Sequence, residues 1–90
     1  MQFEWDATKA AANLAKHGVS FERAILVFDD PAHFTTSDPR HSAELRQNTT
    51  GLVTDLLIIT VTHTDRAGVT RLISARPASR KERNRYHAHR

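Results

Sequence analysis

Two apolar runs in the second half of the chain dominate its pattern of hydrophobic and polar positions. Residues 56–63 form the most apolar and most β-branched stretch, and residues 69–76 form a second run that Pro77 closes. The short polar segment between them, residues 65–68, contains a glycine, and two such runs joined in this way are typical of a β-hairpin. The first run carries few charges and suits a strand buried on both faces, whereas the second places arginines inside an otherwise apolar strand.

The amino-terminal part predicts a short strand followed by two helices. Residues 1–5 alternate weakly between polar and apolar, which favours a strand. Residues 7–17 are rich in alanine, with Asp6 as a candidate N-cap and Gly18 as a candidate left-handed C′ residue. Ser20 can cap a second, amphipathic helix. Its apolar face has members at i, i+3, i+4 and i+7, namely Phe21, Ala24, Ile25 and Phe28.

The remaining segments predict the rest of an α+β fold. Residues 32–36 favour a short extended segment, residues 37–39 a turn, and residues 43–49 a polar edge strand. After the hairpin, Ser79 and Glu82 have the spacing of a capping box, which predicts a final helix rich in basic residues. The expected order is a short strand, two helices, an antiparallel sheet of three to four strands and a basic C-terminal helix.

Length and composition restrict the class of protein further. Ninety residues suit one domain, so we expect residues 1–90 to fold as a unit. The absence of cysteine removes disulfides, thiolate zinc sites and cysteine nucleophiles, and it fits a cytoplasmic protein. No run approaches the roughly 18–20 apolar residues that span a membrane. Glu4 and Asp6 stand where a signal peptide carries cationic residues.

Charge is distributed unevenly along the chain. Residues 1–65 contain five Lys or Arg and nine Asp or Glu, a net charge of −4, whereas residues 66–90 contain eight basic residues and one acidic residue, a net charge of +7. A segment this basic favours a polyanionic partner, with nucleic acid as the first candidate and an acidic protein as the second. The alternative is a solvated basic helix that only keeps the protein soluble.

The chain offers little for metal or cofactor chemistry. His87 and His89 are two residues apart, so on a helix their side chains point in different directions, and no cysteine completes a zinc site. Two-metal cleavage of phosphodiesters needs clustered carboxylates, and the basic end contains only Glu82. No glycine-rich phosphate loop or nucleophilic serine motif is present. We therefore expect neither a metal nor a cofactor.

The remaining basic and aromatic residues suit metal-independent cleavage of RNA. In that reaction the ribose 2′-hydroxyl attacks its own phosphate, so the protein orients the nucleotide, neutralises charge in the transition state and moves protons. Arginine matches phosphate oxygens and stays ionised, whereas histidine and tyrosine can transfer protons. The candidate residues are Arg46, His63, Arg71, Arg76 and Tyr86 for catalysis, and Arg83 and Arg85 for guiding the RNA backbone.

Strand geometry leaves the roles of several candidates open. Arg71 and Arg76 are five residues apart, so an unbroken strand points them to opposite faces. They share one site only if the strand bulges or if Arg76 lies at a frayed strand end. Arg71 has the alternative role of an edge-strand residue that prevents aggregation, Tyr86 that of a packing aromatic, and His63 that of a surface residue at a strand end.

The order of residues along nearly the whole chain resembles the pattern of BrnT toxins. The matching positions are Phe3-Glu4-Trp5-Asp6, Lys9, Asn13, Lys16-His17-Gly18-Val19-Ser20-Phe21-Glu22, Ala24, Val27-Phe28, Asp30-Pro31, Arg71-Leu72-Ile73-Ser74-Ala75-Arg76, Ala78, Glu82-Arg83 and Tyr86. The resemblance implies a RelE-like fold and an endoribonuclease whose catalytic residues lie on the central strands and the C-terminal segment. Of the five catalytic candidates, Arg71, Arg76 and Tyr86 fall in a well-matching block.

The same resemblance implies a protein partner. It would be a BrnA antitoxin with a ribbon-helix-helix DNA-binding domain, and the complex would neutralise the toxin and repress its own operon. Operator DNA would then be contacted only through the complex. Lys16 and His17 would contact either RNA or the antitoxin, and a homodimer is compatible with the sequence. The alternative function is a non-catalytic subunit that binds nucleic acid or the antitoxin and acts in operon autoregulation.

Overall fold

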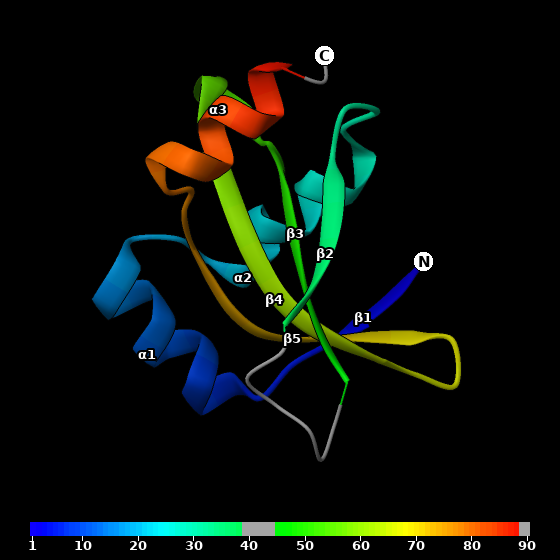
Figure 1. The fold of residues 1–90 in the computed structure, drawn as a ribbon. Helices are drawn as coiled ribbons and strands as arrows, with labels where there is room; N and C mark the ends of the chain where they lie inside the picture. The colour runs from blue at the N-terminus through cyan, green and yellow to red at the C-terminus, as the bar shows by residue number, and fades with distance from the viewer. Residues whose placement is uncertain (39–44, 89–90) are drawn as a thin grey trace.

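The computed structural model describes residues 1–38 and 45–88, which form a five-stranded sheet with helices packed on both sides (Figure 1). The elements are β1 (Gln2–Glu4), α1 (Ala7–His17), α2 (Phe21–Ala24), the 3-10 helix η1 (Ile25–Asp29), β2 (Phe34–Asp38), β3 (Arg46–Leu52), the 3-10 helix η2 (Thr54–Leu56), β4 (Ile58–Arg66), β5 (Val69–Pro77) and α3 (Arg80–Ala88). The order of elements confirms the predicted α+β class. Within the described residues, no helix is long and apolar enough to cross a bilayer.

The sheet differs from the predicted antiparallel sheet of three to four strands. Its order is β1-β5-β4-β3-β2, and β1 joins it in parallel with β5, so the sheet is mixed. A strand does form within the predicted segment 43–49, of which residues 43–44 lie outside the described residues, but its predicted edge position is wrong because β3 lies between β4 and β2. β2 forms the edge instead. Both differences concern pairing between segments far apart in sequence, which local patterns do not specify.

Local helix signals are realised in the structure. The Asp6 carboxylate accepts a hydrogen bond from the Lys9 amide at 2.9 Å, and Gly18 adopts the left-handed conformation with φ of 72°. At α3, Ser79 and Glu82 form both bonds of the capping box, because the Glu82 amide donates to Ser79 Oγ and the Ser79 amide donates to Glu82 Oε1. These features confirm both predicted ends of the first helix and the predicted start of the last one.

The second predicted helix is only partly α-helical. α2 ends at Ala24, and the chain continues as the tighter η1 rather than as one amphipathic α-helix. At the end of η1, the Asp30 carboxylate accepts hydrogen bonds from the amides of Ala32 and Leu52, which fastens this turn to β3. η1 also lies so close to β3 that a Cβ on Gly51 would approach the Val27 backbone oxygen to 3.1 Å. The segment that departs from the predicted α-helix, η1, is therefore the one that packs closely against β3.

The two faces of the sheet carry different side chains. The main core lies between the sheet and α1, α2 and η1, on what we call the helical face, and it includes Val19, Phe21, Ala24, Val27, Ile59, Val61, Leu72 and Ala75. A smaller cluster of Ile58, Ala78 and Tyr86 lies on the other side, where α3 packs over one end of the sheet. We call this second side the arginine face, because the arginines of β5 lie on it.

α1 completes an exposed edge of β5. β1 pairs only with residues 69–71, so no strand of the described ranges borders the following part of β5 on that side. There the buried Asn13 side chain accepts a hydrogen bond from the Ala75 amide at 3.0 Å and donates one to the Ala75 carbonyl at 2.9 Å. Asn13 therefore acts as a substitute strand partner and holds α1 beside the sheet edge.

Candidate nucleic-acid interface

A β-bulge in β5 determines which side chains share a face. Thr62 pairs with Ser74, whereas the next residue, His63, pairs with Leu72, so β5 has one extra residue at Ile73. Because side chains alternate along a strand, one extra residue reverses the face of every position beyond it. The hairpin itself turns at residues 67–68, and β4 is mostly buried, as the apolar pattern predicted.

The bulge brings Arg71 and Arg76 to the same face. Leu72 and Ala75 are three residues apart, yet both are buried in the core on the helical face, so the residues flanking them point the other way. The strand bulge therefore places Arg71 and Arg76 on one surface, which is one of the two possibilities that the sequence left open. Five positions of a strand cover about 16 Å at about 3.3 Å per residue. The two guanidinium groups are therefore suited to separate phosphates of one strand rather than to a single phosphate.

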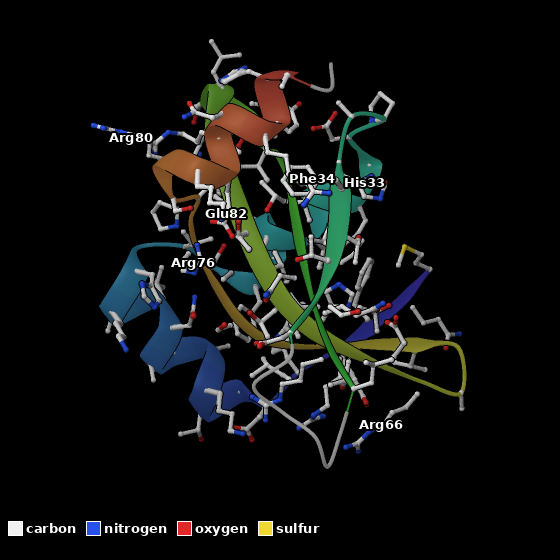
Figure 2. All side chains as sticks on the ribbon, in the orientation of Figure 1. His33, Phe34, Arg66, Arg76, Arg80 and Glu82 are labelled. Atoms are coloured by element: carbon white, nitrogen blue, oxygen red, sulfur yellow. The ribbon has the colours of Figure 1, made fainter. Side chains whose placement is uncertain are left out.

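Basic side chains gather around a cavity on the arginine face. The cavity has a volume of about 480 Å³ and is lined by Lys9, Arg46, Thr64, Arg66, Arg71 and Ile73. Four elements supply its cationic residues, namely α1, β3, β4 and β5. Arg71 Nη1 lies 3.7 Å from Glu4 Oε1 on β1, a contact between two partly exposed groups that solvent screens. The cavity therefore concentrates positive charge, and Figure 2 shows one of its members, Arg66, at the end of the molecule remote from α3.

Arg76 occupies the other end of this face and has a fixed carboxylate partner. Its Nη1 and Nη2 atoms donate to the two Glu82 oxygens at 2.7 and 3.1 Å, and Figure 2 shows the pair beneath α3. Burial alone would raise the pKa of Glu82, but the hydrogen bonds from Arg76 and from the Ser79 amide outweigh it and lower this pKa to about 2. Glu82 is thus ionised at neutral pH and orients the guanidinium group.

Tyr86 is the buried residue of α3 and packs against Ile58 and Ala78. The residue is 2% exposed, and its hydroxyl donates to Asp30 Oδ2 at 2.6 Å. Burial tends to raise the pKa of Asp30, but the hydrogen bonds from Tyr86 and from the Leu52 and Ala32 amides lower it overall. Of the two predicted roles for Tyr86, packing aromatic and proton donor, this geometry describes the first.

His63 lies on the helical face, with the sheet between it and the arginines. It is 3% exposed, so the alternative of a surface histidine at a strand end is wrong. Its Nε2 atom is 2.8 Å from Thr49 Oγ1, and its ring packs edge-on against Phe28. Burial lowers the pKa of His63, although the nearby Asp65 acts in the opposite direction, so the ring is neutral at pH 7.

The other RNA-contact candidates lie outside the basic cavity. Lys16 is exposed at the end of α1, next to the half-buried His17. Arg83 Nη1 donates to the Ala78 carbonyl at 2.7 Å, and the Arg85 guanidinium lies 4.6 Å from the centre of the Phe34 ring. These arginines therefore help to fix α3 on the sheet as well as giving it positive charge.

Two of the four cationic residues of the cavity, Lys9 and Arg66, were not predicted as site residues. Arg66 follows Thr64 at a spacing of two in β4, so the alternation of a strand places it on the arginine face. The sequence contains this alternation, but Arg66 was assigned to the predicted turn at residues 65–68, and it could be placed on this face only if the strand continued into that turn. Lys9 gave no such signal, because only the packing of α1 along the β5 edge brings it to the cavity.

A small α+β protein that presents arginines from a rigid sheet belongs, as a class, with proteins that bind or process nucleic acid. The family model for the ribonuclease toxin BrnT of type II toxin–antitoxin systems matches residues 5–82. The chain belongs to this family. Among solved structures it is similar to the ribonuclease toxin BrnT of Brucella abortus, with 28% sequence identity, a TM-score of 0.66, and coverage of 89% of this chain and 99% of that one. No curated protein sequence matches the chain.

Proposed function

We propose that the chain is an endoribonuclease toxin that cleaves RNA on the arginine face without a metal ion. The observation that carries this proposal is the β5 bulge, which turns Arg71 and Arg76 to one surface. The ribose 2′-hydroxyl supplies the nucleophile, so the protein has to hold the strand and stabilise negative charge on the phosphorane-like transition state. Requirement for that hydroxyl makes the activity selective for RNA over DNA.

The two arginines have different roles in this proposal. Arg71 and the other cations of the basic cavity bind the RNA backbone, because the cavity concentrates positive charge. Arg76 stabilises the scissile phosphate, because Glu82 holds its guanidinium in one orientation before RNA arrives. Glu82 itself is a poor base, since its pKa of about 2 leaves little affinity for a proton at neutral pH.

Membership of a type II toxin–antitoxin family gives the protein an antitoxin partner. We propose that this partner is a BrnA-type antitoxin with a ribbon-helix-helix domain, and that operator DNA is bound only through the complex. Because its proposed substrate is cellular RNA, we propose that the free toxin acts in the cytoplasm. The antitoxin then neutralises the toxin and contributes the DNA contacts that repress the operon.

The first test is expression of the chain alone in cells, with growth and RNA integrity as readouts. We expect growth arrest with RNA fragmentation for the unchanged chain and for Arg80→Gln, which removes an exposed cation of α3 near the arginine face. Arg71→Gln and Arg76→Ala should prevent both effects. Since Arg76→Ala leaves Glu82 without its partner, the folding of each purified variant has to be confirmed by its thermal unfolding. A well-folded Arg76→Ala protein that still fragments RNA would refute the role of Arg76.

A second test addresses the chemistry. Purified toxin should cleave RNA equally well with and without a chelator, and it should leave an oligonucleotide with a single 2′-deoxy substitution intact at that position. Loss of cleavage in chelator, restored by a divalent cation, would contradict the metal-independent reaction.

The second candidate function is binding without turnover. It is favoured by the positions of His63 and Tyr86, because His63 lies across the sheet from the arginines and Tyr86 is buried between α3 and the sheet. In that case the arginines contribute only affinity for nucleic acid or for an acidic antitoxin segment. Salt-sensitive RNA binding with no fragmentation by soluble, folded protein would support this function over the first.

A further inference from the structure

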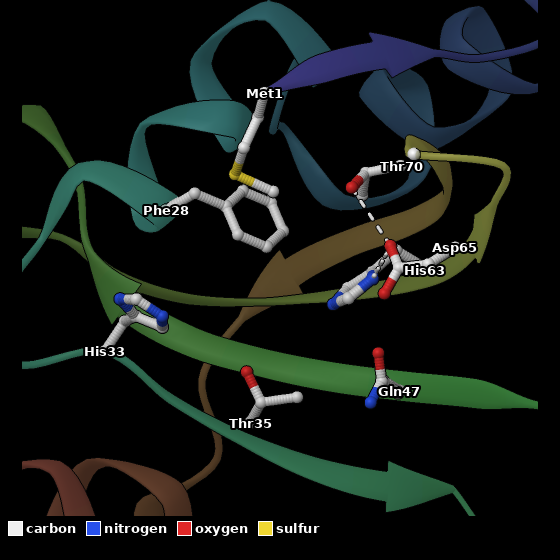
Figure 3. A pocket seen from close by; sticks show the side chains of 9 residues that line it. Met1, Phe28, His33, Thr35, Gln47, His63, Asp65 and Thr70 are labelled. Carbon is white, nitrogen blue, oxygen red and sulfur yellow. Dashed lines mark hydrogen bonds and ion pairs between the residues drawn. The ribbon is translucent and has the colours of Figure 1, made fainter.

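A second cavity lies on the helical face, across the sheet from the arginines. It has a volume of about 440 Å³, and its wall includes Phe28, His33, Thr35, Gln47, His63 and Asp65 (Figure 3). We propose that this cavity binds the guanidinium group of an arginine side chain. The inference goes beyond the proposed ribonuclease activity and uses none of the residues assigned to it.

The hydrogen-bond directions on one wall leave an acceptor facing outward. His63 Nδ1 has no hydrogen-bond partner among the described residues and lies 3.5 Å from Asp65 Oδ1, so the negative charge of Asp65 favours the tautomer with the ring proton on Nδ1. In that tautomer His63 Nε2 accepts from the Thr49 hydroxyl at 2.8 Å, which leaves Thr49 to accept from the Thr35 hydroxyl at 2.8 Å. Because the only hydroxyl proton of Thr35 is used in this series of hydrogen bonds, its Oγ1 atom can only accept a hydrogen bond from a ligand.

The His33 ring also presents a hydrogen-bond acceptor, its Nε2 atom. Its Nδ1 atom lies 2.7 Å from the Asp30 carbonyl oxygen, which can only accept, so Nδ1 carries the proton. The opposite ring atom, Nε2, is therefore an acceptor. His33 is exposed, and its ring stands edge-on to Phe28 with 6.3 Å between the ring centres.

The carboxylate of Asp65 adds negative charge. Thr70 Oγ1 donates to its Oδ1 atom at 3.0 Å, and the His63 contact uses the same oxygen. The side chain remains 54% exposed, and Figure 3 shows its second oxygen on the side of Gln47. That oxygen is available for a charge-assisted hydrogen bond to a ligand inside the cavity.

A carboxylate, two neutral acceptors and aromatic rings select a cation with several N–H donors. Guanidinium fits best, since its planar group offers five donors in fixed directions and packs against rings such as Phe28. An alkylammonium group has the charge but concentrates three donors at one point. Phosphate is disfavoured because the Asp65 carboxylate repels an anion, and the Gln47 amide on the same wall offers a donor without positive charge. The cavity therefore differs in chemistry from the basic cavity on the arginine face.

The proposal can be tested by titrating the isotopically labelled full chain with N-acetyl-arginine amide, whose ends carry no charge, and following backbone amide shifts by NMR. We expect saturable shifts at Thr35, Gln47 and Asp65. N-acetyl-lysine amide should bind more weakly. Asp65→Asn should weaken the binding by at least about tenfold, because it removes a charge-assisted hydrogen bond. Glu22→Gln, which removes an exposed carboxylate on α2, should leave the binding unchanged.

Absence of shifts in these residues, or equal binding by Asp65→Asn and the unchanged chain, would overturn the proposal. If Asp65→Asn fails to fold, Gln47→Leu serves as the second variant, with weaker binding expected. Free arginine distinguishes the source of the ligand: tighter binding than the amide indicates the amino acid itself, and equal or weaker binding indicates an arginine of a bound protein. Asp65→Asn should still cleave RNA, so this proposal and the ribonuclease proposal can fail separately.

Discussion

At the scale of single residues, the Arg76–Glu82 pair couples stability to pH. The folded pKa of Glu82 is about 2, below its ordinary value of 4.5, so its contribution to stability is present above about pH 4.5 and is lost as the pH falls towards 2. A shift of this size corresponds to roughly 3 kcal/mol at most. Urea unfolding at pH 7, 4.5 and 2.5 should show a smaller loss on acidification for Glu82→Gln than for the unchanged chain. Equal losses would contradict this assignment; comparing the two proteins removes the contribution of Asp30, whose pKa is also lowered.

The Tyr86 hydroxyl stabilises the fold through its hydrogen bond to Asp30. Tyr86→Phe removes one hydrogen bond to an ionised carboxylate but keeps the ring that packs against Ile58 and Ala78. We expect a loss of about 1–3 kcal/mol in the free energy of unfolding. RNA cleavage by the folded variant should persist. Complete loss of cleavage with only a small change in stability would instead assign Tyr86 as the proton donor.

At the scale of elements, the contact between α1 and β5 depends on one buried amide. Asn13→Ala leaves the amide and carbonyl groups of Ala75 without partners beside the core, which should cost roughly 2–4 kcal/mol. The matched control is Asn84→Ala, which truncates an exposed asparagine on α3 and should change the stability by less than about 0.5 kcal/mol. Urea unfolding of both variants measures the difference. Similar stabilities would mean that α1 is held by its apolar contacts alone.

The elements also show which features a sequence specifies locally. The caps at Asp6, Gly18 and Ser79 depend on residues within a few positions of each other, and all were predicted correctly. The hairpin was also predicted, but its turn is at residues 67–68 rather than 65–68, because β4 continues to Arg66. The parallel pairing of β1 with β5 and the central place of β3 join segments far apart along the chain, so no local pattern encodes them. The β5 bulge lies between these cases. Leu72 and Ala75 are both apolar at a spacing of three, which is compatible with a bulge but also with a frayed strand end.

For the molecule as a whole, the basic character of the binding surface was predicted correctly, whereas the residues that form it were predicted only in part. The excess of basic residues after residue 65 pointed to a polyanionic partner, and the chain does belong to a ribonuclease toxin family. The members of the basic cavity came from four elements, however, and Lys9 and Arg46 belong to the acidic part of the sequence. Only the folded chain assembles them with Arg66 and Arg71, because the sheet order and the packing of α1 decide which cations become neighbours.

This assembly predicts how the protein binds RNA as salt is varied. Each phosphate that a cation neutralises releases condensed counterions, so the logarithm of the affinity for single strands falls with the logarithm of salt concentration by about 0.7 per contact. Arg66→Gln removes one cation of the basic cavity and should weaken binding while reducing the slope by nearly one contact. A 2′-O-methyl oligonucleotide, which lacks the nucleophile, allows fluorescence anisotropy to measure binding without cleavage.

The control for this measurement is Lys16→Gln, which removes the same charge at the exposed end of α1 and outside the basic cavity. If the cavity binds the RNA backbone, Lys16→Gln should leave the slope unchanged even though it lowers the net charge by the same amount as Arg66→Gln. Equal changes in slope for the two variants would mean that RNA responds to the overall charge, and the cavity would then lose its role as the place where the strand is held. A smaller slope for Arg66→Gln than for Lys16→Gln would show that the cavity, and not the overall charge, binds the RNA backbone. The binding surface would then depend on the fold, because the fold brings together cations from four elements that lie far apart in the sequence.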